Sequence, residues 1–399
     1  MKTCGLDVHK DSVFCAIFDG KQCEKVETYS TLTCDLIQMG SLLQSSGVHQ
    51  IAMESTGIYW IPVWNILEHM GFDLLLVNPY LIKQMPGRKS DVKDAEWIAT
   101  LLHKELLRGS LVPCFLIREL RTYCRKYMKL QGELTSTLQE IERTLEMCNI
   151  RITSFVSNIS GKSIRRIVEK LIQGITDVSD LELCVHGRIR NTHKEKIRQS
   201  LEGFICEHHR FILELLNEKL SMLEKHSSLC LEKMNALVES HYKEDVERLV
   251  TAPGINTLAA IIIIAETGAD MRHFPTSSKF AGWTGLRPRN DESAGKYKST
   301  ATTKGNKYLR SILVQIGWSA SRVKNGYFMK KFIRLIIRKS RKKALVAIAR
   351  KMAVIIWNIL NNKVIYDPHK LPVYNLEKIM TQINYHQKEM ERLDKLISH

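Results

Sequence analysis

The sequence predicts an α/β domain at the amino terminus, a long helical middle section and a mainly helical carboxyl-terminal domain. Short β-like runs alternate with amphipathic helical stretches over residues 1–115. Apolar residues then recur at steps of three and four along two long central segments, which is the period of a helix face. Ala- and Ile-rich stretches with interspersed Lys and Arg fill much of the remainder. The alternation of strands and helices places the first domain in the mixed α/β class.

Three strands are predicted at the start of the chain. Apolar and β-branched runs at Thr3–His9, Ser12–Asp19 and Lys25–Ser30 have strand character, and Asp19-Gly20 has the residues of a tight hairpin turn. Short connections of this kind join antiparallel neighbours. We therefore expect the sheet to begin with three antiparallel strands.

Helices and strands alternate after these strands. An amphipathic stretch at Leu36–Leu43 precedes a strand at Gln50–Met53, and a helix at Ile58–Met70 precedes a buried strand at Phe72–Val77. A further helix begins at Asp91. Three antiparallel strands followed by alternating helix and strand is the ribonuclease H-like order, in which the first and fourth strands lie side by side.

Four acidic residues occur in the predicted strands or at a helix start. They are Asp7 in the first strand, Glu54 at the end of the fourth, and Asp91 and Asp94 one helical turn apart. Acids in a first turn often only interact favourably with the helix macrodipole, and a Glu at a strand end often lies at the surface. Asp7 is harder to explain in this way, because it lies within an apolar stretch where an unpaired charge is costly. In the predicted strand order the four carboxylates can converge on one cluster of divalent metal ions.

The middle of the chain has the pattern of two long helices. Apolar residues from Leu120 to Ile152 follow steps of three and four with one extra step of four, which indicates a coiled-coil seam with a stutter. A second such stretch, Leu201–Leu237, is expected to return against the first. Gly161 and Gly174 mark breaks between them. The pattern fits an intramolecular helical hairpin as well as a dimer seam.

The segment Ala252-Pro253-Gly254-Ile255 precedes an Ala- and Ile-rich helix and resembles a helix-hairpin-helix turn. In that motif a Gly permits the tight turn, and exposed backbone N–H groups meet a DNA phosphate. Gly254 is therefore a candidate phosphate contact.

Ser293 lies in a polar loop, Asn290–Lys296, ahead of a basic helix that begins near Asn306. A loop hydroxyl can reach a phosphodiester, and nearby cations can steady its charge. The chemistry of Ser293 alone does not distinguish it from an ordinary loop residue, and other hydroxyls stand close by. The candidate cations are Lys296, Lys298, Lys304 and Arg310.

Charge favours a polyanionic partner. The chain of 399 residues has a formal net charge of +17, with 44% hydrophobic residues as in ordinary globular proteins. Arg338, Arg341 and Lys342 lie on helix-like sequence with few acids between them, which favours a phosphate-binding face. A last amphipathic helix follows Asp367-Pro368.

Cysteine usage and hydropathy predict a cytoplasmic protein without a membrane role. The ten cysteines form no C-x-x-C pair, and the amino terminus lacks an apolar signal core. The longest apolar run, Leu258–Ala265, is far below the roughly 20 residues needed to span a bilayer. Cys206, His208 and His209 are close in sequence, but adjacent helical positions point in different directions, so we expect no zinc site there.

Two long blocks of this chain resemble the insertion-sequence-110 family of transposases. The first contains GLDVHKD, MESTGIYW and LVNPYLIKQMPGRKSDVKDAEWIA, and the second is LVTAPGINTLAAIIIIAETGADMRHFPTSSKFAGWTGLRP followed by ESAGKYKSTATTKGNKYLRSIL. The resemblance is specific because two independent long blocks agree in order. It implies a RuvC-like DEDD domain in which Asp7, Glu54, Asp91 and Asp94 bind Mg2+, with target and donor DNA as partners.

The resemblance also implies a serine nucleophile and a guide RNA. In the family, a Ser before a Gly-Lys pair forms a covalent phosphoserine with DNA, and Ser293 matches, although Ala294 stands where many relatives carry Gly. Family members use a structured noncoding RNA to bridge target and donor DNA. The resemblance also favours a dimerising arm, and we expect a homo-oligomer, a dimer or tetramer. The residues expected to contact nucleic acid are Gly254, Lys296, Lys298, Lys304, Arg310, Arg338, Arg341 and Lys342.

We expect four regions: a RuvC-like catalytic domain at residues 1–115, a helical coiled-coil arm at 116–245, a transposase domain with the serine loop at 246–368, and an amphipathic tail at 369–399. The expected function is DNA transposition by strand cleavage and rejoining. A RuvC-like Holliday-junction nuclease, with water as nucleophile, or a site-specific DNA invertase would use the same acids. The nuclease predicts no covalent protein–DNA adduct. A catalytically idle nucleic-acid-binding regulator would not need the acids.

Overall fold

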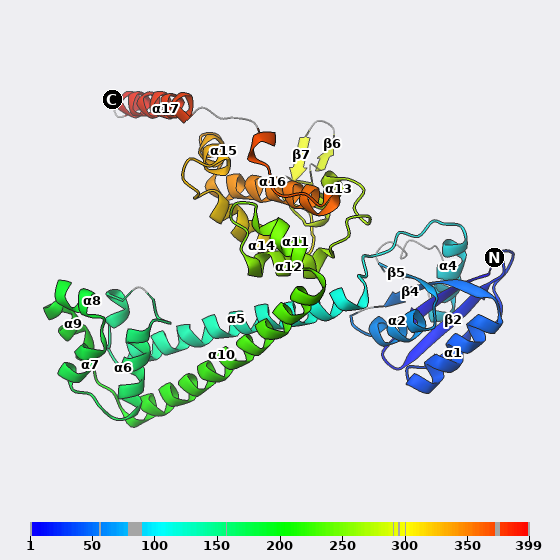
Figure 1. Ribbon diagram of the computed structural model, residues 1–399, viewed down its shortest axis with the longest axis horizontal. Coiled ribbons are helices and arrows are strands. Elements are labelled where there is room, and N and C mark those ends of the chain that lie inside the picture. The colour runs from blue at the N-terminus through cyan, green and yellow to red at the C-terminus, as the bar shows by residue number, and fades with distance from the viewer. Residues whose placement is uncertain are drawn as a thin grey trace. The chain divides into compact units, whose positions relative to one another are not determined.

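The computed structural model describes residues 2–55, 57–78, 90–156, 158–289, 291–293, 296–299, 301–371 and 376–397. The chain divides into two compact units, residues 1–112 and 113–399 (Figure 1). In the part of the chain that is described, unit 1 is built on a five-stranded sheet, whereas unit 2 is helical with one short hairpin.

The sheet of unit 1 has the strand order β3-β2-β1-β4-β5. Strand β2 pairs antiparallel with β1 and β3, whereas β4 pairs parallel with β1 and β5. The prediction of three antiparallel strands followed by alternating helices and strands is confirmed. The strands are β1 (Lys2–Val8), β2 (Ser12–Phe18), β3 (Glu27–Ser30), β4 (Val48–Ser55) and β5 (Asp73–Val77).

Helices cover both faces of this sheet. Side chains of one strand alternate between the two faces, so each face of β1 packs with different helices. The even-numbered residues of β1, such as Leu6, pack with helices α1 (Thr33–Ser45) and α2 (Trp60–His69). The opposite face is covered by α4 (Asp91–His103), through Ala95 and Ala99. The acidic helix start is thus on the same side of the sheet as the odd-numbered residues of β1.

A glycine in β1 allows α4 to lie unusually close to the sheet. A Cβ atom on Gly5 would overlap the backbone of Ala95 and Ala99. Next to it, the Thr3 hydroxyl donates a hydrogen bond to the Ala99 carbonyl at 3.1 Å. Two residues of strand advance about 6.6 Å and four residues of helix about 6 Å, so the two elements stay in step. One further step places Asp91 beside Asp7.

Unit 2 begins with an arm of two long helices, α5 (Phe115–Met147) and α10 (Glu207–His241), which pack against each other (Figure 1). The buried residues include Leu130, Ile141 and Leu145 on α5, and Leu213 and Leu220 on α10. Both helices were predicted, and α5 ends at Met147 rather than near Ile152. Within one chain the two helices pack as an intramolecular hairpin, and pairing of the arm with a second chain stays a prediction.

The segment between the arm helices forms four further short helices, where the sequence indicated only breaks. Gly161 is the residue that precedes the first of these helices. Their apolar faces share one core with the end of the arm, including Ile167, Leu181 and Ile197. The helices are α6 (Lys162–Ile172), α7 (Val178–Cys184), α8 (Gly187–Thr192) and α9 (Lys194–Leu201), preceded by the 3-10 turn η1 (Ile152–Ser154).

The carboxyl-terminal part of unit 2 is a helical domain around α12 (Thr257–Thr267). Every residue from Ala259 to Thr267 is buried, as expected of a helix that is apolar all round. Its neighbours along the chain are α11 (Lys243–Val250), α13 (Ser277–Trp283), α14 (Lys307–Ala320), α15 (Tyr327–Ile336), α16 (Arg341–Asn362), the 3-10 turn η2 (Pro368–Lys370) and α17 (Leu376–Ile397).

Helix α16 is the one helix, among the described residues, that is long and apolar enough to cross a membrane by length and composition alone. Half of its most apolar stretch is buried inside the protein. Its inner face carries Ile348, Met352 and Ile356 and packs on α13 and α14. We therefore assign α16 to the core of this domain.

Two details differ from, or sharpen, the sequence interpretation. The segment around Ser293 is a hairpin rather than a loop, with β6 (Asp291–Ser293) antiparallel to β7 (Lys296–Ser299). Gly254 has the left-handed φ of +85° that a tight turn requires. A Cβ there would also overlap the backbone of α14 at Ile316 and Ala320, so helix packing accounts for this glycine, and its contact with phosphate stays a prediction.

Candidate functional site

Asp7 and Glu54 are direct neighbours at one end of the sheet. They pair in register across the parallel strands β1 and β4, as predicted. Asp7 is 7% exposed, and Glu54 is partly buried. Because both strands run in the same direction, their carboxyl ends place these two acids on the same edge.

Helix α4 brings the other two acids to this edge. Ser90 caps the helix by accepting a hydrogen bond from the Lys93 backbone N–H, so Asp91 and Asp94 fall in the first turn. Asp91 is exposed and Asp94 is partly buried. The contact of Gly5 with this helix fixes how near the first turn comes to Asp7.

His9 is a member of the cluster that the sequence interpretation missed. Its Nε2 atom lies 3.2 Å from Asp7 Oδ2 and 3.7 Å from Asp91 Oδ1. The donor atoms of Asp7, His9 and Asp91 all lie within 4.8 Å of one another, close enough to hold one metal ion. The available signal was the spacing of two between Asp7 and His9, which places both on one face of an extended chain.

The electrostatic environment of Asp7 suits a carboxylate that binds a cation. Burial raises the pKa of this carboxyl, and the charges of Asp91 and Asp94 raise it further, although His9 acts in the opposite direction. The folded chain thus holds a buried acid among other acids, an arrangement that a bound cation would relieve. Carboxylate oxygens are the ligands that Mg2+ and other hard divalent ions prefer.

Ser293 is the last residue of β6 and pairs with Lys296 across the hairpin. The side chains of Ser293, Lys296 and Lys298 lie outside the described part of the chain, as do Ala294 and Gly295. The backbone alone places the serine next to the two-residue connection of the hairpin. Lys304 is exposed just beyond β7.

The base of this hairpin is tightly held. Pro288 and Thr302 form an isolated antiparallel bridge, and Arg289 N–H donates to the Ala301 carbonyl at 2.9 Å. The Arg310 guanidinium donates to the Thr302 hydroxyl at 2.8 Å. A Cβ on Gly305 would overlap the backbone of Gly285, so the two chain segments cross in direct contact.

A buried ionic network connects this region to the arm. Glu266, on α12, is fully buried and accepts two hydrogen bonds of 2.8 Å from Arg125 of α5. Asn306 donates its side-chain amide to the same carboxylate at 2.6 Å. The carbonyl oxygen of Asn306's side chain caps α14 by accepting from the Tyr308 and Leu309 backbone N–H groups. Glu266 therefore joins α5, α12 and the start of α14.

A cationic groove lies beside the hairpin base. It has a volume of 580 Å3, and its lining includes Pro288 and Thr302 from the hairpin base. No acid is present among the described residues that line it. The cations that line it are Arg310, Lys339, Lys342, Lys343 and Arg350. Such a surface suits a polyanion.

The groove contains two of the basic residues that the sequence indicated, Arg310 and Lys342. Arg338 and Arg341 are exposed but do not line it. The sequence interpretation did not select the other three groove cations, Lys339, Lys343 and Arg350. The helical spacing of 343 and 350, two turns apart on α16, was the signal that places them on one face.

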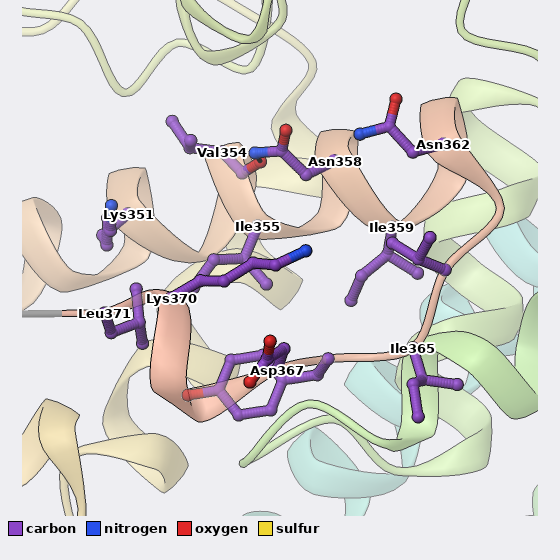
Figure 2. Close-up of a pocket in the computed structure, with 12 residues that line it drawn as sticks. Lys351, Val354, Ile355, Asn358, Ile359, Asn362, Ile365, Asp367, Lys370 and Leu371 are labelled. Atoms are coloured by element: carbon purple, nitrogen blue, oxygen red, sulfur yellow. Dashed lines mark hydrogen bonds between the residues drawn. The ribbon is translucent and has the colours of Figure 1, made fainter.

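A second hollow, of 230 Å3, lies further along α16, opposite the segment that carries Ile365 and Asp367 (Figure 2). Its lining mixes apolar side chains with the amides of Asn358 and Asn362. Charges of both signs, from Lys370 and Asp367, are present. It therefore lacks the uniform charge of the cationic groove.

Comparisons with known proteins match the two blocks separately. A family model of the DEDD IS110 type, described as Transposase, matches residues 4–150, and one described as Transposase IS116/IS110/IS902 family matches residues 246–334. Both describe transposases of insertion sequences.

Full-length relatives agree with the family models. A Sinorhizobium fredii protein with the transposase designation y4pF/y4sB is 33% identical over 332 residues, covering 78% of this chain and 73% of the relative. A Pseudomonas aeruginosa protein designated a family 20 transposase is 28% identical over 327 residues, covering 80% and 86%. The chain belongs to the IS110 family of insertion-sequence transposases.

Among solved structures, T. thermophilus RuvC in complex with a Holliday junction substrate covers 28% of this chain and 99% of its own, at 12% identity. The TM-score is 0.22, too low to establish a shared fold. The description of unit 1 rests on its own strand order and pairing.

Proposed function

We propose that this transposase cuts and rejoins DNA strands with a divalent metal bound by Asp7, Glu54, Asp91 and Asp94, and with Ser293 as nucleophile. The observation that carries the metal proposal is the buried Asp7, whose pKa is raised by burial and by Asp91 and Asp94. An acid placed at such a cost to the folded state is typical of a functional site.

The four carboxylates would hold Mg2+, since all offer oxygen donors and all are supplied by strand or helix positions. The bound ion would polarise the scissile phosphate and help to neutralise developing charge. His9, between Asp7 and Asp91, would hold the two carboxylates in place before the ion binds.

The test is cleavage by Asp7→Asn and Asp94→Asn. Both variants should lose strand cleavage and keep DNA binding, because only the charge of one ligand is removed. Asp73→Asn is a matched control, since Asp73 begins β5 at the opposite end of the sheet and is exposed. Cleavage at the wild-type rate by Asp7→Asn would sink the metal assignment.

Ser293 would act as nucleophile by forming a bond from its Oγ to the phosphorus. The bond from phosphorus to the departing DNA oxygen breaks, and the serine proton ends on that oxygen or on solvent. Attack of a DNA hydroxyl on the phosphoserine would then release the serine and form the new strand. The position of Ser293 next to the connection of a hairpin whose base lines a groove of cations supports this role.

A suicide DNA substrate tests this chemistry. We expect a trapped protein–DNA adduct with the wild-type chain and with Ser299→Ala, and none with Ser293→Ala. Ser299 is a fair control because it lies in the facing strand of the same hairpin. Free cleaved ends from an unimpaired Ser293→Ala chain would show that water is the nucleophile, as in a junction nuclease.

The cationic groove would carry the DNA backbone towards the hairpin. Five cations without an interleaved acid among the described lining residues support this, and the groove shares Pro288 and Thr302 with the hairpin base. Lys343→Gln with Arg350→Gln should weaken DNA binding and flatten its salt dependence by about two in log–log slope. Lys324→Gln, exposed elsewhere in unit 2, should leave the slope unchanged.

A homo-oligomer and a structured guide RNA complete the proposal. The oligomer is supported by an exposed apolar stripe on α10, in which Leu215, Met222 and Leu229 are 47%, 50% and 49% exposed. Their spacing of seven is that of a coiled-coil seam. Replacing all three by Gln should reduce the mass measured by light scattering to that of one chain. RNA that co-purifies with the protein, when sequenced, tests the guide.

A further inference from the structure

Three side chains with metal-binding donors meet at the beginning of α10. The donor atoms of Cys206, His208 and His209 all lie within 4.8 Å of one another. None of the three belongs to the acid cluster or to the cationic groove. They lie at the end of the arm that carries the short helices α6 to α9 (Figure 1).

This convergence corrects the expectation that neighbouring helical positions would point apart. The helix begins only at Glu207, and Cys206 is its N-cap with an extended backbone, φ −99° and ψ 170°. From that position the thiol turns back over the first turn in a capping-box arrangement, and the His209 backbone N–H donates to the Cys206 carbonyl at 3.1 Å. The Cys206 N–H donates in turn to His209 Nδ1 at 3.2 Å.

The second imidazole is held close to the first. The ring centroids of His208 and His209 are 3.9 Å apart. His208 is exposed, whereas Cys206 and His209 are partly buried. A fixed thiol and a fixed imidazole thus face a third donor that can rotate towards them.

The donor set selects the metal. One thiolate and two imidazoles favour Zn2+ and similar transition-metal ions over the hard Mg2+, which prefers oxygen. Zn–S and Zn–N bonds of about 2.3 and 2.0–2.1 Å place tetrahedral neighbours roughly 3.3–3.6 Å apart. The three donors need only a small inward movement of the His208 ring, and His209 would exchange its hydrogen bond from Cys206 for a metal bond.

We propose that Cys206, His208 and His209 form a zinc-type site with water in the fourth position, and that the ion fixes the first turn of α10, where the chain leaves the junction of the two arm helices. The junction is already close at this point, because Phe204 N–H donates to the Cys148 carbonyl at the end of α5 at 2.9 Å. An ion on Cys206, two residues further on, would restrain the same turn.

Titration of the full-length chain with Co2+ and Zn2+ tests the site. The Asp7→Asn background is used so that the acid cluster does not bind the probe. We expect one Co2+ per chain with the intense absorption of thiolate coordination. Cys206→Ser should remove that absorption, and Cys206→Ser and His208→Ala should each weaken Zn2+ binding by at least about tenfold. Zn2+ should also slow hydrogen exchange at residues 204–212 in the parent chain but not in Cys206→Ser or His208→Ala.

Matched controls lie on the same helix. Cys230→Ala and His226→Ala should bind both ions as the parent does, since neither residue belongs to the cluster. Serine is a good N-cap, so Cys206→Ser keeps the helix start. The exposed His208 gives a second variant that does not depend on the cap. A Co2+ spectrum without thiolate absorption, or Zn2+ affinity unchanged in His208→Ala, would overturn the proposal, as would equal losses in the control variants.

Discussion

Replacing Glu266 by Gln should destabilise unit 2 and loosen the start of α14. The side chain is 1% exposed and is paired with Arg125 through two hydrogen bonds and with Arg121 at 3.7 Å. Gln keeps the shape of Glu but removes its charge, so it leaves two arginines without a buried counter-charge. It also weakens the hydrogen bond from Asn306, which caps α14.

The expected cost is about 3 kcal/mol, the lower end of the ~3–5 kcal/mol seen when one partner of a buried pair is removed. The lower end applies because the Arg125 side chain is 40% exposed and can turn to water, whereas Arg121 is only 17% exposed. Arg125→Met alone should cost less, since Glu266 retains Arg121 and Asn306. The two substitutions together should differ from their sum by at least about 1 kcal/mol.

Hydrogen exchange of the α12 and α14 amides measures this loss without requiring both units to unfold together. Burial raises the pKa of Glu266, but hydrogen bonds from Arg125 and Asn306 outweigh it and hold the pKa below the ordinary value. The stabilisation is therefore complete above the unfolded pKa of about 4.3 and is lost as pH falls through the lower folded pKa. Strict additivity of the two substitutions, or a Gln variant as stable as wild type at pH 7, would refute the reasoning.

The other predictions concern unit 1. Gly5→Ala should displace α4, lower the free energy of unfolding by about 1–3 kcal/mol and abolish cleavage. Thermal unfolding and a cleavage assay measure these effects. Gly132→Ala is the control, because Gly132 lies in open space on α5, and it should change neither stability nor cleavage. Asp7→Asn should raise the melting temperature of the metal-free chain at neutral pH, because the raised pKa of Asp7 means that its ionised form opposes folding. That gain should shrink as pH falls through the folded pKa of Asp7, and added Mg2+ should stabilise only the wild type. A melting temperature for the metal-free variant below that of wild type would contradict this assignment of Asp7.

The strand order of unit 1 was predictable because it follows from short-range patterns in the sequence. Alternating apolar residues, the Asp19-Gly20 turn and the spacing of helices and strands determine which strands can pair, and β1 and β4 pair in register at Asp7 and Glu54. The approach of α4 was not predictable in the same way. It depends on the missing side chain of Gly5, and a single glycine in a strand has several ordinary explanations.

The arm and the Cys206 cluster show where local patterns fail. The apolar stripe of α5 specified a long helix but not its partner, since a neighbouring helix of the same chain and a second chain offer equivalent surfaces. The four helices α6 to α9 are short, and their cores form only against the arm, so each alone carries a weak periodic signal. The cluster was missed because one residue, Cys206, precedes the helix instead of belonging to it.

Glu266 connects these observations to the chemistry of the hairpin. Arg121 and Arg125 come from α5, Asn306 begins α14, and strand β7 ends a few residues before Asn306. Through Asn306, the buried carboxylate therefore helps to hold the segment that leads from the hairpin into α14. Disturbing that carboxylate should misplace Ser293 while leaving in place the groove cations of α16, Lys342, Lys343 and Arg350.

A defect in placing Ser293 can thus be distinguished from a defect in DNA binding, which a single activity assay would not separate. Glu266→Gln, examined at a temperature where it is folded, should form the protein–DNA adduct at least about tenfold more slowly than wild type, as expected for a misplaced reacting group. Its DNA affinity and salt dependence should be nearly unchanged. Lys343→Gln with Arg350→Gln should show the reverse, with binding weakened and adduct formation restored at saturating DNA. If Glu266→Gln lost affinity and adduct formation in equal measure, the carboxylate would support the whole domain and would have no separate part in placing the hairpin.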